Sequence, residues 1–259
     1  MRVLICHDTA TAACRTADIL CDAVAARHGA VLGLATGGTM EPVYALLRDR
    51  LAAGTLDLSG TTTFNLDEYV GLAGDHPQSY RATMNRLLFD AADLRRSRTH
   101  LPDGAASDPA TEARRYDAAI AAAGGIDLQL LGIGGNGHIG FNEPTSSLGS
   151  RTRVKTLTAE TRAANARFFG PEEEAPRYAI TMGIATILES RSCVLLATGP
   201  GKAAAVAAAI EGPVSAACPA SALQLHPSAT MILDPEAAAD LRLRDYYETV
   251  HPGGGEAPL

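Results

Sequence analysis

The sequence contains no apolar segment long enough to cross a bilayer and no charged-then-apolar leader. Its first apolar run, at residues 2–6, is far too short for either purpose. We therefore expect a cytoplasmic protein that has no membrane partner.

Cysteines are few, and the spacings typical of metal sites are missing. The five cysteines are odd in number and form no C-x-x-C pair, and no cluster of His and Cys has zinc spacing. This pattern favours a reducing compartment and predicts no metal site. Cys14 and Cys21 lie seven residues apart on a predicted helix, where we expect both to be small buried hydrophobic residues.

Positive charge is also scarce. The formal net charge is −7, which argues against broad binding to nucleic acids or anionic membranes. Only two of the 22 basic residues are lysines, Lys155 and Lys202. An anionic substrate would therefore need a local group of cationic side chains.

The rest of the composition is that of an ordinary soluble globular protein, with 46% hydrophobic and 20% charged residues. Short apolar runs alternate with helical patterns, which predicts an α/β fold with a mostly parallel sheet covered by helices on both faces. We expect residues 1–250 to form a single domain and residues 251–259 to be a flexible tail. The predicted strands are residues 2–6, 31–35, 61–66, 126–131, 192–197 and 230–233. The predicted helices are residues 9–27, 41–52, 79–88, 108–122 and 201–210, and residues 177–188 are expected to be a short strand followed by a helix.

Ligands of such sheets bind beyond the carboxyl ends of the strands. That rule selects four segments, all predicted to be loops: residues 36–39, 67–69, 132–143 and 199–202. They are also the segments richest in chemically useful side chains. We therefore expect them to meet in one active site.

The segment 132–143 is the most informative of the four. Four of its first six residues are glycines, which allow the backbone to come close to a ligand. His138 is suited to moving protons near neutral pH. Glu143 could orient this imidazole, and Asn136 lies on its other side in the sequence. The alternative is a glycine-rich turn with an ordinary loop histidine.

Residues 132–137 also fit the pattern G-x-G-x-x-G. A dinucleotide site needs a helix that opens on the third glycine. Gly140 and Pro144 would break such a helix early. We therefore expect no nicotinamide or flavin cofactor.

Two other segments offer an anion site. Gly37, Gly38 and Thr39 open a helix, where free backbone N–H groups and the helix dipole attract negative charge. Lys202 follows a Gly-Pro-Gly turn that is not a Walker loop, so a single phosphate is indicated rather than a nucleoside triphosphate. The alternative is a solvated lysine at the start of a helix.

The acidic residues at 67–68 can be interpreted in two ways, and the basic residues between 151 and 167 also need an interpretation. Asp67 and Glu68 end a predicted strand, and a carboxylate there is a candidate general base. The alternative is a helix N-cap or a solvated pair. Most basic residues between 151 and 167 are expected to form a solvated face.

Taken together, four motifs resemble the glucosamine-6-phosphate deaminase family. They are FNLDEYVGL at 64–72, GGNGHIGFNEP at 134–144, SRTRVKTLT at 150–158 and LQLHP at 223–227. Lactonases of the same fold share a Gly-His loop but not the Asn142-Glu143-Pro144 that follows it. The resemblance implies a modified Rossmann-like sheet, no metal or cofactor, and conversion of glucosamine 6-phosphate and water to fructose 6-phosphate and ammonia.

The resemblance also implies roles by matching positions. Asp67 would move a proton from carbon 2 to carbon 1 of the sugar. His138 would assist ring opening, with Glu143 and Asn136 as its partners. Residues 153–181 would resemble the family's mobile lid. The positions that match substrate or phosphate binding are Gly37, Gly38, Thr39, Gly137, Arg167 and Lys202.

Two departures from the family leave questions open. Position 136 is Asn where some members have Asp, so it can orient His138 but cannot stabilise an imidazolium by charge. Some members are activated by N-acetylglucosamine 6-phosphate at a subunit interface. Arg153 and Lys155 match part of that site, but residues 241–250 align poorly with the rest, which leaves activation and a homo-oligomer open. The alternative functions are a related sugar-phosphate isomerase or lactonase and a non-catalytic sugar-phosphate sensor.

Overall fold

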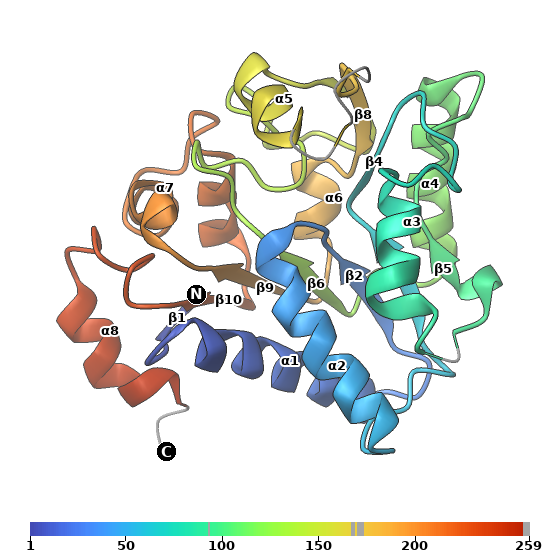
Figure 1. The fold of residues 1–259 in the computed structure, drawn as a ribbon. Helices are drawn as coiled ribbons and strands as arrows, with labels where there is room; N and C mark the ends of the chain where they lie inside the picture. Colours follow the sequence, from blue (N-terminus) through green and yellow to red (C-terminus); the bar gives the residue numbers. More distant parts are fainter. Residues whose placement is uncertain (93, 167–168, 170–173, 256–259) are drawn as a thin grey trace.

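A computed structural model describes residues 1–92, 94–166, 169 and 174–255 of the chain. At its centre is a seven-stranded sheet in which neighbouring strands are parallel (Figure 1). This sheet confirms the predicted α/β class. In their order across the sheet, the strands are β1 (Arg2–Ile5), β10 (Ala229–Leu233), β9 (Ser192–Ala197), β6 (Leu128–Leu131), β2 (Val31–Leu34), β3 (Thr62–Asn65) and β5 (Thr99–His100).

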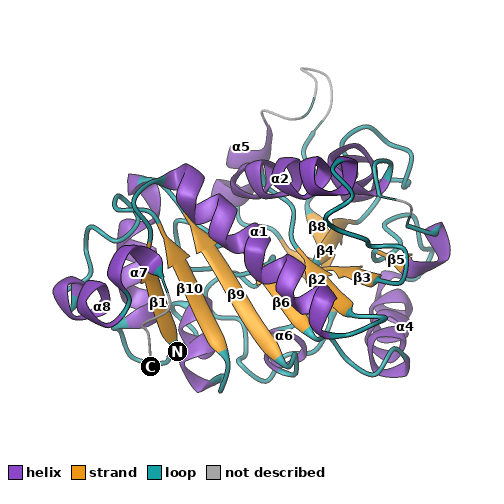
Figure 2. Cartoon of the chain, turned by 90° about the horizontal axis from the view of Figure 1, so that it is seen from below, coloured by secondary structure: helices purple, strands orange, loops and turns teal. Residues whose placement is uncertain are grey.

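Helices cover both faces of the sheet (Figure 2). On one face, Thr63 of β3 lines a small apolar cavity with side chains of α1 (Thr9–Ala26) and α2 (Glu41–Ala52). On the other, Phe64 packs against Tyr116 of α4 (Pro109–Ala122), with ring centroids 5.7 Å apart. Successive strand residues point to opposite faces, so these helices lie on opposite sides of the sheet.

Further helical segments connect the strands. Within the described residues, the structure contains no helix with the length and apolar character that a bilayer span requires. The shorter α-helices are α3 (Tyr80–Met84), α5 (Ala159–Ala166), α6 (Ile184–Leu188), α7 (Ala203–Ile210) and α8 (Arg244–Val250). The π-helical turn is η2 (Asn85–Phe89), and the 3-10 turns are η1 (Gly38–Met40), η3 (Arg96–Arg98), η4 (Pro200–Lys202), η5 (Pro219–Leu225) and η6 (Pro252–Gly254).

A second, smaller sheet begins beyond the carboxyl end of β3. It is antiparallel, with the order β4 (Asp67–Tyr69), β8 (Tyr178–Thr181) and β7 (Arg153–Thr156). The prediction that residues 67–69 form a loop is therefore wrong, because only Leu66 separates β3 from β4. Asp67 pairs with Thr181, a partner so distant in the sequence that no local pattern signals it.

Most predicted elements are confirmed, with ends shifted by a few residues. Residues 177–188 form a strand and then a helix, as expected. The strand β5 was missed because its two residues are too few to show an alternating pattern. In the expected tail, Gly254 is buried near Cys6, and residues 256–259 lie outside the described residues.

The cysteines are all free. Cys14 and Cys21 were predicted to be buried, but both are only half-buried. Arg50 of α2 reaches them across the helix pair, and its guanidinium donates to the Cys21 sulfur at 3.1 Å. The seven-residue spacing within one helix could not show that a charged side chain of the adjacent helix contacts both cysteines.

Candidate active site

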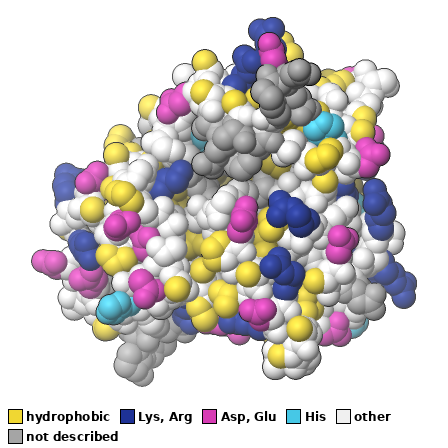
Figure 3. Space-filling model, viewed as in Figure 1, with side chains coloured by type: hydrophobic (Ala, Val, Ile, Leu, Met, Phe, Trp, Pro, Cys, Tyr) yellow, Lys and Arg dark blue, Asp and Glu magenta, His cyan; other side chains and the backbone are white. Residues whose placement is uncertain are grey.

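A pocket of about 430 Å³ opens at the carboxyl edge of the parallel sheet. The four segments predicted to converge, 36–39, 67–69, 132–143 and 199–202, all contribute to its lining. They follow β2, β3, β6 and β9, and the carboxyl ends of parallel strands lie at one edge of a sheet. On the face shown in Figure 3, acidic and basic side chains of the described residues are interspersed, so these residues form no broad basic surface there.

Two turns on this edge are built alike. Gly37 has φ 119° and is followed by η1 and then α2, and Gly199 has φ 84° and is followed by η4 and then α7. Positive φ favours glycine at both positions. The Gly199 N–H donates to the buried carboxylate of Asp234, with N···O distances of 2.9 and 3.1 Å. Each turn leads the chain from a strand end into a helix beside the pocket.

Lys202 is the cation of the second turn, and it lines the pocket. Burial lowers the pKa of its amino group. Within the described part of the chain, no carboxylate forms an ion pair with it. A partly buried, unpaired ammonium group beside two helix starts is suited to binding a phosphate. This placement argues against the alternative of a purely solvated lysine.

Asp67 and Glu68 point in opposite directions from β4, as neighbouring strand residues must. Asp67 lines the pocket and is only 6% exposed. Burial, and then the charge of Glu68, raise the pKa of Asp67 to about 8. Glu68 instead accepts backbone N–H bonds from Tyr69, Tyr80 and Arg81, each at 2.9 Å, and so holds the start of α3. Asp67 thus stays the candidate general base, and Glu68 is neither solvated nor the N-cap of α3, which is Ser79.

His138 lies beside Glu143 in the pocket wall. The imidazole Nδ1 is 3.4 Å from Glu143 Oε2. Gly134 makes room for the ring, since a Cβ there would come within 2.3 to 2.5 Å of three ring atoms. Glycine at this position is therefore a steric requirement of the histidine.

Asn136 reaches the imidazole only through Glu143, which differs from the direct contact that we expected. Its amide Nδ2 donates to Glu143 Oε2 at 2.8 Å, and its Oδ1 accepts the backbone N–H of His138 at 3.2 Å. Burial raises the pKa of Glu143, but contacts with His138, Thr161 and Asn136 outweigh it and lower that pKa to about 2. The carboxylate beside His138 is therefore held in its charged form.

Three more residues named in the sequence analysis lie in or near this loop region or outside the described residues. Gly137 has φ 85° and lies against Cys218, where it shapes the loop. Arg167 lies outside the described residues. Arg151 is exposed and pairs with Asp117 and Glu189. The expectation that most of these basic residues form a solvated face is wrong, because Arg153, Lys155 and Arg162 are half-buried, and Arg153 donates inward to Asn142 Oδ1 at 2.8 Å.

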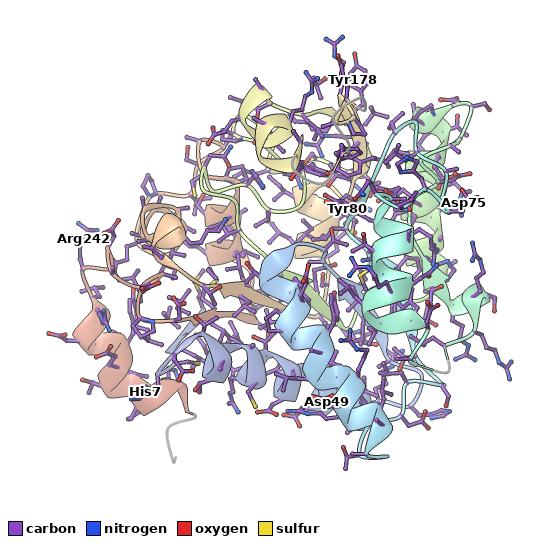
Figure 4. The ribbon with its side chains drawn as sticks, in the orientation of Figure 1. His7, Asp49, Asp75, Tyr80, Tyr178 and Arg242 are labelled. Carbon is purple, nitrogen blue, oxygen red and sulfur yellow. The ribbon has the colours of Figure 1, made fainter. Side chains whose placement is uncertain are left out.

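Sequence reasoning missed Tyr80 and three residues of a later helix, all of which line the pocket. Tyr80 and Phe141 are stacked with ring centroids 6.0 Å apart, and Tyr80 lies on the inner side of α3 (Figure 4). Glu160, Thr161 and Asn165 come from α5. The one sequence signal was Thr158, which precedes this helix as a typical N-cap. Among the described residues, no group of three or more His, Cys, Asp or Glu side chains could hold a metal ion.

Comparison with known proteins agrees with this geometry. Residues 7–232 match the family described as glucosamine-6-phosphate isomerases/6-phosphogluconolactonase. The chain belongs to this family. Within it, the glucosamine-6-phosphate deaminase of Shewanella loihica is 52% identical over 250 residues, which cover 96% of this chain and 93% of the relative. The deaminase of Streptomyces avermitilis is 51% identical over 254 residues, covering 98% and 97%.

Solved structures of the isomerase/lactonase family give the same result. A monomeric glucosamine-6-phosphate deaminase matches with a TM-score of 0.90 and 46% identity, covering 93% of this chain and 100% of that one. The 6-phosphogluconolactonase of Leishmania guyanensis has a TM-score of 0.73 and 22% identity over 91% of this chain and 97% of its own. The second likeness is one of fold alone. The predicted family and fold are confirmed.

Proposed function

We propose that this protein is a glucosamine-6-phosphate deaminase, which converts glucosamine 6-phosphate and water to fructose 6-phosphate and ammonia. Full-length relatives at about half identity carry this name. The observation that supports it most directly is that one pocket is lined by two acid/base groups, the buried Asp67 and His138, with Glu143 behind His138 at 3.4 Å from Nδ1. Such a soluble enzyme would act in the cytoplasm on amino sugar phosphates during their breakdown.

The phosphate end of the substrate binds between the two glycine turns. Lys202 supplies a positive charge, and the backbone at Gly37, Gly38 and Thr39 supplies N–H donors at the start of η1. Arg167 would add a second cation, by its match to the family. This remote group supplies binding energy that orients the sugar for the chemistry at carbons 1 and 2.

Ring opening is the task of His138. The imidazole takes the proton of the hydroxyl on carbon 1 and gives it to the ring oxygen as the bond between that oxygen and carbon 1 breaks. Glu143, ionised and 3.4 Å from Nδ1, holds the ring and stabilises its transient positive charge. The product of this step is the open-chain aldehyde with an amine on carbon 2.

Asp67 then moves one proton. It takes the hydrogen of carbon 2 while the ammonium group on carbon 2 gives one of its protons to the carbonyl oxygen on carbon 1, which yields a neutral enolamine. The same carboxyl returns its proton to carbon 1 and leaves an iminium at carbon 2. Water adds to that iminium, the hydroxyl proton passes to the nitrogen, and ammonia departs. A pKa raised by burial makes Asp67 a stronger base than an exposed aspartate, which suits removal of a proton from carbon.

The purified protein incubated with glucosamine 6-phosphate should release ammonia and fructose 6-phosphate in equal amounts. A lactonase would instead hydrolyse 6-phosphogluconolactone without forming ammonia, and a sensor would bind the sugar phosphate without turnover. The proposal is supported if the wild-type protein forms ammonia and fructose 6-phosphate in equal amounts and Asp67→Asn forms neither. Binding without either product would refute it.

A further inference from the structure

Helix α5 is connected to the proposed acid/base pair by one side chain. The helix contributes three residues to the pocket lining, and one of them, Thr161, is buried. Its hydroxyl donates a hydrogen bond to Glu143 Oε1. The contact joins residues 18 positions apart, from two different segments of the chain.

The Glu143 carboxylate is therefore held at both of its oxygens. Oε2 accepts from Asn136 at 2.8 Å and faces His138 Nδ1 at 3.4 Å. Oε1 accepts from Thr161 and lies 3.4 Å from the hydroxyl of Thr158. Without a partner at Oε1, the carboxylate could rotate about its last bond and turn Oε2 away from the imidazole.

The Thr161 hydroxyl is not needed to form the helix. The side chain of Thr158 caps α5, since its Oγ1 accepts the backbone N–H of Thr161 at 3.1 Å. The cap uses the main chain of Thr161, and the Thr161 hydroxyl, which accepts from Thr158 Oγ1 at 3.0 Å, keeps its own hydrogen for Glu143. Removing that hydroxyl should leave the helix capped.

We propose that Thr161 is a positioning residue for the reaction, which holds Glu143 in the orientation that presents Oε2 to His138. This inference rests on the proposed role of His138 in ring opening. Thr161 acts through Glu143, and α5 must lie against the pocket wall for the contact to form. The helix thereby sets the geometry of the acid/base pair.

The test compares Thr161→Val, which keeps the shape but loses the hydroxyl, with Thr161→Ser, which keeps the hydroxyl. We expect kcat to fall about ten- to a hundredfold in Thr161→Val, the scale of a hydrogen bond to a charged group, with KM within about threefold of wild type. Thr161→Ser should stay within about threefold of wild type in both constants. Thr16→Val is the matched control, because Thr16 is a buried helical threonine on α1 whose hydroxyl bonds only to the Ala12 carbonyl.

Two further measurements distinguish a positioning role of Thr161 from a general loss of structure. The hydrogen bond from Thr161 is one of the contacts that lower the pKa of Glu143, so the Glu143 carboxyl, followed by NMR, should titrate at higher pH in Thr161→Val than in wild type. Substrate deuterated at carbon 2 reports the proton transfer to Asp67. If ring opening becomes the slow step, the isotope effect on kcat should fall toward one in Thr161→Val and remain in Thr161→Ser.

Several results would overturn the proposal. These are a Val variant as active as wild type, a Ser variant as impaired as Val, and a slow Val variant in which the Glu143 titration and the isotope effect are both unchanged. A wild-type protein that releases no ammonia would instead refute the proposed function itself. Circular dichroism and thermal melting of both variants distinguish each of these results from misfolding.

Discussion

Replacing Asp67 by asparagine should remove activity and at the same time stabilise the fold. Asp67 is only 6% exposed, and among the described residues none donates a hydrogen bond to its carboxylate. Burial and the neighbouring charge of Glu68 raise its pKa to about 8. Asparagine has nearly the same shape and no charge, so the substitution removes the cost of ionising a buried group.

The sign and size of the effect follow from proton linkage. In the unfolded chain Asp67 has a pKa of about 3.9, so between pH 4 and pH 8 the folded state keeps a proton that the unfolded state releases. The free energy of unfolding therefore falls as pH rises through this window, and it levels off above the folded pKa. At one pKa unit per about 1.4 kcal/mol, this cost reaches at most about 4 kcal/mol at pH 7 and about 1.5 kcal/mol at pH 5.

Urea unfolding of wild type and Asp67→Asn at pH 5 and pH 7.5 measures this difference directly. Asp75→Asn is the control, since Asp75 is exposed on the outer side of the molecule (Figure 4). The stabilisation by Asp67→Asn should grow with pH, whereas Asp75→Asn should change little at either pH. A gain that is the same at both pH values would refute a raised pKa at Asp67.

The same variant tests the catalytic role. Turnover should fall by about 10² to 10⁴, the usual range for a positioned acid or base, with little change in substrate affinity. A variant that keeps more than half of wild-type turnover would remove Asp67 from the mechanism. Stability gained while activity is lost is typical of a side chain that is held at a site for function.

Three further substitutions test the rest of the pocket. Lys202→Met should weaken substrate binding by about 1.5 to 3 kcal/mol, and the loss should nearly vanish with unphosphorylated glucosamine; equal weakening of both ligands would contradict a phosphate contact. Asn136→Asp places a second carboxylate against Glu143, which should raise the pKa of Glu143 by about one unit in an NMR titration of its carboxyl group; an unmoved titration would count against this contact. Gly134→Ala should displace the His138 ring and reduce kcat by about a hundredfold or more, as measured by ammonia release; near-normal turnover would show that the ring does not need this position.

Much of the fold could be read from the sequence because its signals are local. Buried parallel strands are short apolar runs, and their ends are marked by glycine and polar residues within a few positions. The carboxyl-end rule then placed segments 36–39, 67–69, 132–143 and 199–202 at one edge without any knowledge of side-chain contacts. The motifs around Asp67 and His138 indicated the family for the same reason, since each is contiguous.

Only the tertiary structure determines which of the two neighbouring acidic residues faces the pocket and which one points away from it. Asp67 and Glu68 are adjacent and chemically alike, and the pairing of β4 with β8 determines which one faces the pocket. The contact of Thr161 with Glu143 likewise depends on where α5 packs. Such contacts join residues that are distant in the sequence, and their energy comes from burial and geometry that exist only after the chain has folded, so no local pattern can encode them.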